Sequence, residues 1–233
     1  MRIRHRVGKE ELKEDKFQQT VEKVAEFYYA DPKRFWIGVA LGLLVIVGVI
    51  LLLQNRPKPG INAEAELRLM DALGNYFQNN NEYAEQALKE LAAKFGRDYA
   101  GVKAHYYLGS LYLRQQPPRV AEAKREFNIF LKKSGRDPVL NPAALMGLAL
   151  CEEKQGNYLK AAALYEKVYR QFAQSPLGFE GMMQAGRCYR QAGALDKAEK
   201  VYNELLKKEK GSGPKVEEIR TELAFIKALK NRL

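Results

Sequence analysis

The sequence predicts an all-α protein in which one membrane-spanning helix precedes a solenoid of stacked helical hairpins. Three observations support this class. Residues 35–53 contain no charged or polar side chain. A pattern of small and large apolar residues repeats at a spacing of 37 residues in the second half of the chain, and such a period is typical of repeat proteins. Residues 61–233 show helical periodicity without the alternation that half-buried strands would need.

Composition and charge narrow the classes of function. The 233 residues carry 39 Lys and Arg against 28 Asp and Glu, a net charge of +11. Two cysteines exclude a disulfide scaffold, and two histidines argue against a histidine-ligated metal cluster. Most basic residues are interleaved with acidic ones, as on solvated helix faces. The densest basic cluster, within residues 207–215, fits attraction to anionic headgroups as well as it fits nucleic acid. Because no nucleic-acid-binding motif is present, we expect no nucleic-acid partner.

Residues 1–34 form a mostly polar N-terminal arm. Phe17, Val21, Val24 and Tyr28 recur at helical spacing before Asp31-Pro32, so the arm is expected to contain a short amphipathic helix. Two interpretations fit this pattern. The helix rests on lipid headgroups, which the pattern alone favours, or it docks to a membrane partner.

The run from Phe35 to Leu53 has the length and composition of a transmembrane helix. Nineteen residues give a helix about 28 Å long, close to the roughly 30 Å of a hydrocarbon core. The long preceding arm and the lack of a small-residue cleavage site argue against a signal peptide. Gly38 and Gly42 form a G-x-x-x-G motif, which would allow a homodimer through this span.

The orientation of this span is predicted from the basic residues around it. Close to the span the two sides carry similar positive charge, but the far end of the arm adds Arg2, Arg4, Arg6, Lys9 and Lys13. The positive-inside rule therefore favours a cytoplasmic N-terminus, with residues 54–60 as a linker to an extracytoplasmic C-terminal domain. The reversed orientation is the alternative.

Three segments of the C-terminal region share one pattern of apolar residues. Each has a helix with a small residue near its centre, a turn, and a second helix that begins with Ala-x-x-x-aromatic. Small residues let helices approach closely, and Gly in a turn permits a left-handed helix end. The copies are His105-x-x-Leu108-Gly109 with Ala123-x-x-x-Phe127, Leu145-x-x-Leu148-Ala149 with Gly156 and Ala161-x-x-x-Tyr165, and Met182-x-x-Ala185-Gly186 with Gly193 and Ala198-x-x-x-Tyr202.

These residues resemble the tetratricopeptide repeat family, whose helix–turn–helix units stack into a right-handed solenoid. The resemblance covers residues 100–209 well and extends to a degenerate hairpin before them, with its turn expected at 80–82. A last helix with one apolar face would cap the open end of the solenoid. The expected elements are hairpins at 61–97, 100–134, 141–175 and 178–209, and a capping helix at 215–232.

An arm, one span, a linker and a repeat solenoid are similar in layout to a bacterial inner-membrane family. Its members are N-terminally anchored periplasmic tetratricopeptide proteins, and they include the ancillary subunit of the Sec translocon. The resemblance implies a scaffold or chaperone-like adapter in protein secretion or envelope assembly. The alternatives are a cytosol-facing import or targeting receptor and a structural subunit of a larger membrane complex.

Tetratricopeptide proteins bind partners along the concave face, which the first helix of each hairpin lines. Flexible Met and Leu with surrounding Arg and Lys suit an extended peptide that carries apolar and acidic side chains. Tyr106 and Ser110 stand where a clamp for two carboxylates would need Lys and Asn, so that clamp is not expected. A solvated groove without a fixed ligand is the alternative. The resemblance places these residues on the groove: Lys103, Tyr106, Ser110, Leu113, Arg114, Met146, Leu150, Glu153, Lys154, Met183, Arg187 and Arg190.

No constellation of residues points to catalysis. His105 falls at a packing position of a repeat helix, and residues 211–215 lack the spacing of a phosphate-binding loop. We therefore expect no enzyme, cofactor or metal site. Cys151 and Cys188 occupy the same position in adjacent repeats, where neighbouring helices lie about 8–10 Å apart, beyond the reach of a disulfide. Both are expected to be buried free thiols.

Overall fold

A computed structural model describes residues 28–54, 60–135, 137–209 and 213–232, with the backbone alone for residues 49–54. The chain divides into two compact units, Met1–Arg56 and Pro57–Leu233. Of the amphipathic helix expected in the arm, residues 1–27 lie outside the described part of the chain.

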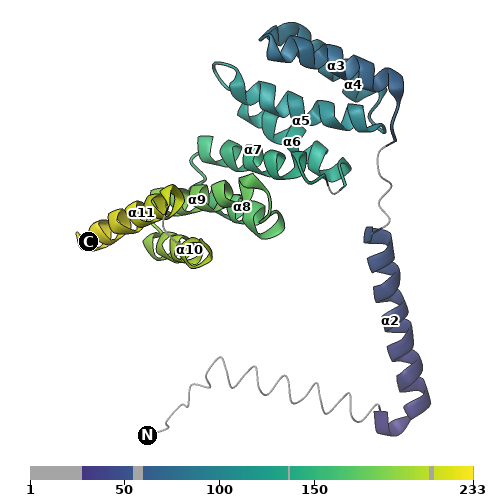
Figure 1. The fold of residues 1–233 in the computed structure, drawn as a ribbon. Helices are drawn as coiled ribbons and strands as arrows, with labels where there is room; N and C mark the ends of the chain where they lie inside the picture. Colours follow the sequence, from purple (N-terminus) through teal and green to yellow (C-terminus); the bar gives the residue numbers. More distant parts are fainter. Residues whose placement is uncertain (1–27, 55–59, 136, 210–212, 233) are drawn as a thin grey trace, which may run out of the picture. The chain divides into compact units, whose positions relative to one another are not determined.

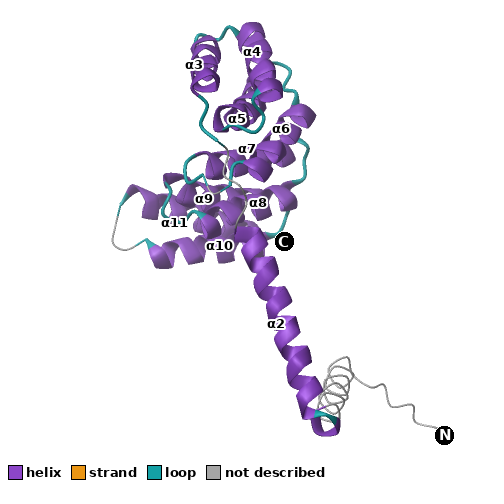
Figure 2. Cartoon of the chain, turned by 90° about the vertical axis from the view of Figure 1, so that its right-hand side faces the viewer, coloured by secondary structure: helices purple, strands orange, loops and turns teal. Residues whose placement is uncertain are grey.

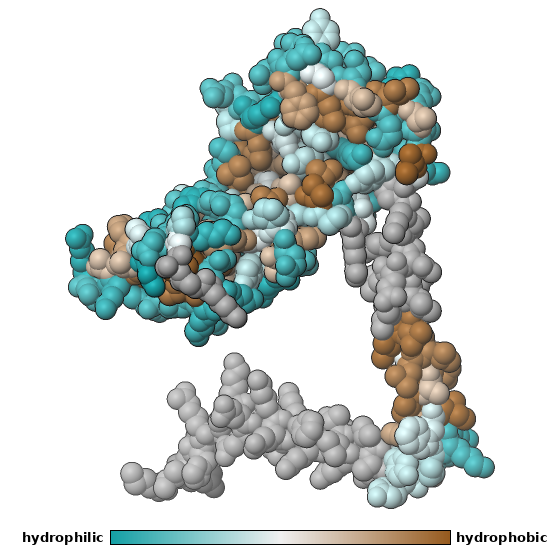
Figure 3. Space-filling model, viewed as in Figure 1, coloured by the Kyte–Doolittle hydropathy of each residue, from teal (hydrophilic) through white to brown (hydrophobic). Residues whose placement is uncertain are grey.

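The described part of the first unit is built around helix α2 (Pro32–Gln54). Asp31 begins it: its side chain accepts a hydrogen bond from the Arg34 amide at 3.1 Å, and its carbonyl accepts one from the Phe35 amide at 3.0 Å. Most of the large apolar side chains described on α2 are exposed, from Val39 at 36% to Leu44 at 66%, and Figure 3 shows apolar residues on the visible face of this helix. Among the described residues, no helix combines the length and the apolar character needed to cross a membrane.

Two expectations about this helix remain predictions. The expected span runs to residue 53, and its side chains beyond Gly48 lie outside the described set. Side chains added at Gly38 and Gly42 would meet no described atom within 4 Å, so these positions are open on the isolated helix. The homodimer through them stays a prediction.

The second unit is a stack of helical hairpins (Figures 1 and 2). In each hairpin we call the first helix A and the second helix B. Each helix packs mainly against its neighbours in the chain. The all-α repeat solenoid predicted from the sequence is confirmed. The hairpins are α3 (Ala63–Phe77) with α4 (Asn81–Lys94), α5 (Tyr99–Arg114) with α6 (Val120–Lys133), α7 (Leu140–Lys154) with α8 (Tyr158–Gln171), and α9 (Pro176–Gln191) with α10 (Leu195–Lys208).

The turns inside three hairpins depend on a residue in the left-handed conformation. Gly156 and Gly193 have φ of +76° and +72°, which only glycine adopts without strain. In the first hairpin Asn79 fills this role with φ of 61°, and Asn tolerates this region better than most residues. The turn therefore lies at 78–80, two residues before the expected 80–82, and α4 already begins at Asn81.

The core is continuous along the stack because small residues on A helices receive aromatic rings from B helices. A Cβ added at Gly109 would lie 2.9 Å from the Phe127 ring, and one added at Gly186 would lie 2.4 Å from the Tyr202 ring. These are the close approaches that the repeat pattern predicts. Phe127 and Tyr202 are each 1% exposed, so the rings fill the space that the glycines leave.

Cys151 and Cys188 are both free and fully buried, as expected. Burial raises the pKa of the Cys151 thiol to about 11 and that of Cys188 to about 12. Because the thiolate is the reactive form, both cysteines are poorly reactive near neutral pH.

The final helix α11 (Pro214–Lys230) packs on α10 and closes the stack. Val216, Ile219 and Ile226 are buried against the last hairpin. The Tyr202 hydroxyl donates to the Glu222 carboxylate at 3.4 Å and so adds a polar contact between α10 and α11. The helix thus takes the place of a next A helix.

Candidate interaction groove

The curvature of the solenoid follows from which helices meet between hairpins. Successive A helices contact one another, α3 with α5, α5 with α7 and α7 with α9. Among the described helices, no pair of successive B helices makes a contact of that extent. Because neighbouring hairpins lie closer on the A side, the stack curves towards it, and the exposed positions of the A helices line a concave face. We call this face the groove.

On α5 the expected groove residues Tyr106, Ser110 and Leu113 are half-buried. The Tyr106 ring packs on the rings of Phe127 and Phe130, with centroids 6.0 and 5.7 Å away. Burial raises the pKa of the Tyr106 hydroxyl, so it stays neutral at physiological pH. This part of the groove is a fixed aromatic floor with one hydroxyl beside it.

The two cations expected on α5 are held by α3 and by aromatic rings. Lys103 Nζ lies 3.5 Å from the Glu66 carboxylate. Arg114 donates a hydrogen bond to the Tyr76 carbonyl at 3.2 Å and stacks 4.1 Å above the Tyr76 ring centroid. Both side chains therefore brace α5 against α3, and neither points freely at a ligand.

Helix α3 contributes groove residues that the sequence reasoning missed. Leu67, Met70 and Phe77 are each 69% exposed although all three are large and apolar. The signal that could have found them is a 36-residue offset between Leu69-x-x-Ala72-x-x-x-Tyr76 and the first clear repeat. At that offset they correspond to Lys103, Tyr106 and Leu113.

These exposed residues do not simply mark the unpaired end of the stack. The outward side of α3, about 100° further round the helix, carries the exposed polar residues Glu64, Arg68 and Asp71. At the 36-residue offset, Arg68 corresponds to Ala104 of α5 and Asn75 corresponds to Leu111. Ala104 and Leu111 are both fully buried, so α3 has polar residues where a helix inside the stack has buried apolar ones. This end of the solenoid thus presents a polar face, and the large exposed apolar residues of α3 lie on its groove side.

On α7 the groove changes from apolar to charged. Met146 and Leu150 are half-buried, whereas Lys154 is exposed. Glu153 is paired across to α9, where Arg187 Nη2 donates to its carboxylate at 2.8 Å. Two residues expected to recognise a ligand therefore satisfy each other.

On α9 the expected groove residues are engaged within the protein. Met183 is 6% exposed and belongs to the core. Arg190 lies 3.5 Å from the Glu222 carboxylate of α11 and 4.8 Å from the Phe225 ring centroid. That carboxylate contact is an ion pair without a hydrogen bond from Arg190 Nε. The groove at α9 is a polar, internally paired surface.

The groove consequently has two halves of different chemistry. The first half, over α3 and α5, exposes apolar side chains, and Figure 3 shows apolar residues at the surface of this end of the solenoid. The second half, from the C-terminal end of α7 through α9 to α11, presents ion pairs. Side chains for apolar contacts are thus available mainly in the first half.

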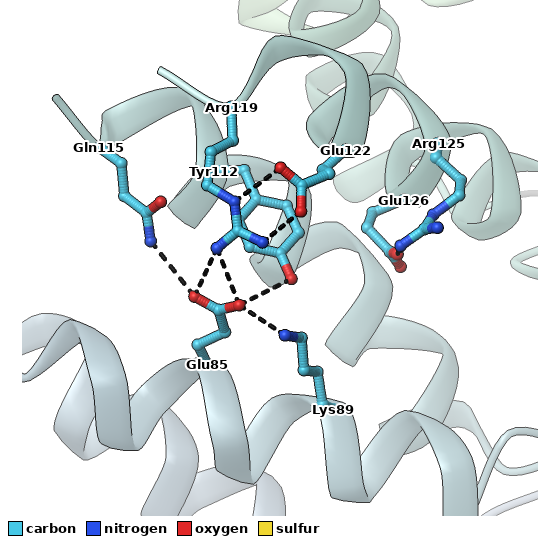
Figure 4. A network of polar contacts seen from close by, with 8 residues as sticks. All are labelled: Glu85, Lys89, Tyr112, Gln115, Arg119, Glu122, Arg125 and Glu126. Atoms are coloured by element: carbon cyan, nitrogen blue, oxygen red, sulfur yellow. Dashed lines mark hydrogen bonds and ion pairs between the residues drawn. The ribbon is translucent and has the colours of Figure 1, made fainter. Parts of the chain in front are cut away.

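A half-buried ion network lies behind the first half, between α4 and the turn from α5 to α6 (Figure 4). The Glu85 carboxylate of α4 accepts two hydrogen bonds from Arg119 Nη1, both at 2.9 Å, and one from Lys89 at 2.6 Å. Tyr112 and Gln115 donate to the same carboxylate at 3.2 and 3.3 Å. Burial alone would raise the pKa of Glu85, but the hydrogen bonds from Lys89 and Arg119 hold it at about 2.

His105 is a structural residue in this geometry. Its Nδ1 lies 2.6 Å from the Glu126 carboxylate, and both side chains are buried between α5 and α6. Burial acts to raise the pKa of Glu126, but the contacts with His105 and Arg125 together outweigh it and lower the pKa. Among the described residues, no three His, Cys, Asp or Glu side chains are placed to bind a metal ion.

Comparisons with known proteins agree with the fold. Residues 141–207 match the family model described as tetratricopeptide repeat. One similar solved structure contains the nearly identical TPR-like repeats of a kinesin light chain from Podosopora anserina, with a TM-score of 0.56 and 16% identity over 72% of this chain and 88% of that one. A single-residue variant of that protein has the same TM-score and identity over 72% and 87%. No curated protein matches the chain.

The solenoid is therefore a tetratricopeptide-like repeat fold, and such repeats indicate a non-catalytic scaffold for protein–protein interaction. At 16% identity the solved structures support the fold alone. The finer resemblance to anchored periplasmic proteins and the translocon subunit stays a prediction.

Proposed function

We propose that the chain is a membrane-anchored scaffold that binds an extended apolar segment of a partner protein in the first half of its groove. The observation that carries the binding site is the stripe Leu67, Met70 and Phe77, each 69% exposed on the concave side of α3. Fully burying such a side chain contributes about 1.5–3 kcal/mol. In the isolated solenoid these three side chains remain exposed to solvent, so this free energy becomes available only when a partner covers them.

The shape and chemistry of the groove favour a segment with apolar side chains. The stripe on α3 continues onto the half-buried Tyr106 and Leu113 of α5 and Met146 of α7. Met adapts its shape to different apolar partners, while the aromatic floor under Tyr106 is rigid. Because Arg187 and Arg190 are already paired with Glu153 and Glu222, acidic groups of the partner would have to displace those contacts.

The anchor is supported by the sequence of residues 35–53, which lack any charged or polar side chain. A helix whose large apolar side chains are exposed on several sides, as described on α2, needs an apolar environment. With a cytoplasmic arm, the solenoid would lie outside the membrane, where it would serve protein secretion or envelope assembly. Resistance of the full chain to extraction by alkaline carbonate tests the anchor, and protection of the solenoid from protease in closed inside-out vesicles tests the orientation.

Site-specific photo-crosslinking in native membranes tests the groove. A benzophenone amino acid at position 70 or 77 should give a discrete adduct with one partner, identified by mass spectrometry. The matched control is position 159, because Leu159 is 52% exposed on the B helix α8. Adducts of equal yield at 70 and 159 would contradict a specific groove.

A second variant separates the groove from the anchor. Leu67→Ser with Met70→Ser should lower the adduct yield at position 113 at least tenfold, since each loses roughly 1–2 kcal/mol of apolar contact. The variant should stay in the membrane fraction to the same extent as the unchanged chain. If the adduct at 113 persists, the partner binds elsewhere on the solenoid, as a structural subunit of a larger complex would.

A further inference from the structure

The edge of the solenoid where B helices end and the next A helices begin carries a row of exposed cations. We call its described members the basic edge. None of these residues forms an ion pair within the part of the chain that the structure describes. The basic edge consists of Arg97, Lys132, Lys133, Lys207, Lys208 and Lys215, all exposed.

Contacts between neighbouring turns make this edge one continuous surface. Lys133 Nζ donates to the Gly96 carbonyl at 3.3 Å, which joins the second and first of these turns. Lys208 Nζ lies 4.8 Å from the Tyr169 ring centroid, and so joins the end of α10 to the end of α8. At the last turn, Lys215 Nζ lies 4.5 Å from the ring centroid of Phe179 on α9. The cations are therefore spaced along one side of the stack.

Acidic residues on this edge are mostly occupied by the fold. Asp137 is 8% exposed and accepts hydrogen bonds from the Val139 and Leu140 amides at 2.8 and 2.7 Å. Glu64 is paired with Lys94, and Glu217 with Arg220. Asp98 and Glu209 in these turns are half-buried and form no ion pair among the described residues, and the six exposed cations outnumber them.

The opposite edge, where A helices turn into B helices, has few charged residues in its turns. Its turns are Gln78–Asn80, Gln115–Arg119, Gln155–Asn157 and Ala192–Ala194, which contain one charged residue. That residue is Arg119, and it is neutralised by Glu85 and Glu122. The helix ends beside these turns carry the exposed cations Lys154, Lys160 and Lys197, so cations at helix ends occur on both edges.

The chain enters the solenoid at the basic edge. Gly60 pairs with Asp98 in an isolated bridge, and its carbonyl accepts a hydrogen bond from the Tyr99 amide at 2.8 Å. Only residues 55–59 separate Gly60 from the end of α2. A fully extended chain of that length spans about 20 Å, so the basic edge is the part of the solenoid that a short tether joins to the predicted span at residues 35–53.

We propose that the basic edge is a docking surface for the anionic headgroups of a lipid bilayer. The inference rests on the proposed anchor, because the short tether selects a membrane over nucleic acid or an acidic protein as the occupant. Lys and Arg side chains close to a bilayer surface are attracted by anionic headgroups, and this attraction fades within a Debye length. Docking would hold the solenoid by one edge and leave the groove accessible.

Hydrogen exchange of the full chain with two kinds of vesicle tests this surface. Neutral phosphatidylcholine vesicles report the anchor, since only apolar insertion retains the protein on them. Vesicles with roughly one-third phosphatidylglycerol add the headgroup charge. In the second kind, exchange in segments 130–135 and 205–209 should slow at least threefold relative to the first kind, while segment 154–158 on the opposite edge should not change. Salt at about 0.5 M should remove the difference.

A matched pair of variants assigns the effect to the edge. Lys132→Gln, Lys133→Gln and Lys207→Gln together should abolish the slowing on anionic vesicles. Lys160→Gln, Lys197→Gln and Lys200→Gln remove the same charge from exposed positions elsewhere and should leave it intact. Equal loss in both variants overturns the proposal, as does protection by a single-stranded RNA oligonucleotide in the absence of any protection by anionic vesicles. Failure of the anchor alone appears separately, as absence from neutral vesicles.

Discussion

The two halves of the groove differ in where the protein places the polar contacts that hold it together. In the first half a polar network centres on Glu85, between α4 and the turn from α5 to α6, and the groove side carries the ion pair Glu66–Lys103 beside the exposed apolar residues of α3. In the second half the ion pairs Glu153–Arg187 and Arg190–Glu222 lie between A helices on the groove side. Polar contacts behind the A helices leave the groove face accessible to a partner, whereas ion pairs on the groove face occupy it.

Acidification should produce the largest difference between the halves. The pKa of Glu85 is lowered in the folded chain from 4.5 to about 2, so its stabilisation is present above pH 4.5 and lost as the pH falls through 2. The loss over that window should be about 2–3 kcal/mol. Urea unfolding monitored by hydrogen exchange should show α4–α6 losing stability most steeply between pH 4.5 and 2. Glu85→Gln should flatten this dependence, and an unchanged slope would show that the network contributes nothing.

A methyl group added to an A-helix glycine should have opposite effects in the two halves. Gly186→Ala places a Cβ 2.4 Å from the Tyr202 ring, so we expect a loss of about 2 kcal/mol in the free energy of unfolding. Gly74→Ala meets nothing within 4 Å and should stabilise α3 by about 0.5–1 kcal/mol, because alanine loses less backbone entropy in a helix. Chemical denaturation measures both. Stabilisation by Gly186→Ala would mean that the Tyr202 ring can move aside.

Removing the ion pair on the groove should have the smallest effect. Glu153→Gln keeps the shape of the side chain but leaves the half-buried Arg187 without its carboxylate. We expect a loss of about 1 kcal/mol in the free energy of unfolding. Crosslinking at position 70 should be unchanged, because that position belongs to the first half. A reduced adduct there would show that the two halves act as one site.

The repeat pattern predicted the hairpins well because each depends on local and periodic features. Small residues such as Gly109 and Gly186 are required by close helix contacts, and they recur at the period of the fold. The first hairpin was harder to place because Asn79, not glycine, takes the left-handed position in its turn. For the same reason no groove residues were assigned to α3, and its exposed stripe was missed.

The individual groove residues were less predictable than the groove. Periodicity places Arg187 and Arg190 on a face, but whether they are free depends on Glu153 and Glu222, which belong to other helices. Met183 sits at the position of the half-buried Met146, yet it is buried in the last hairpin's core. Whether a groove residue is free, paired or buried depends on side-chain packing between repeats, and the spacing of residues in the sequence carries no information about that packing.

The polar outward side of α3 limits the length of the groove. Glu64, Arg68 and Asp71 cover the side of α3 on which another hairpin would stack. The described part of the solenoid has five helices in A positions, α3, α5, α7, α9 and α11. Four steps of about 10 Å give a track of about 40 Å, the length of roughly 12 residues of extended peptide. A proposed partner segment that followed the whole groove could place only about 12 residues along it, and the apolar first half covers the step from α3 to α5.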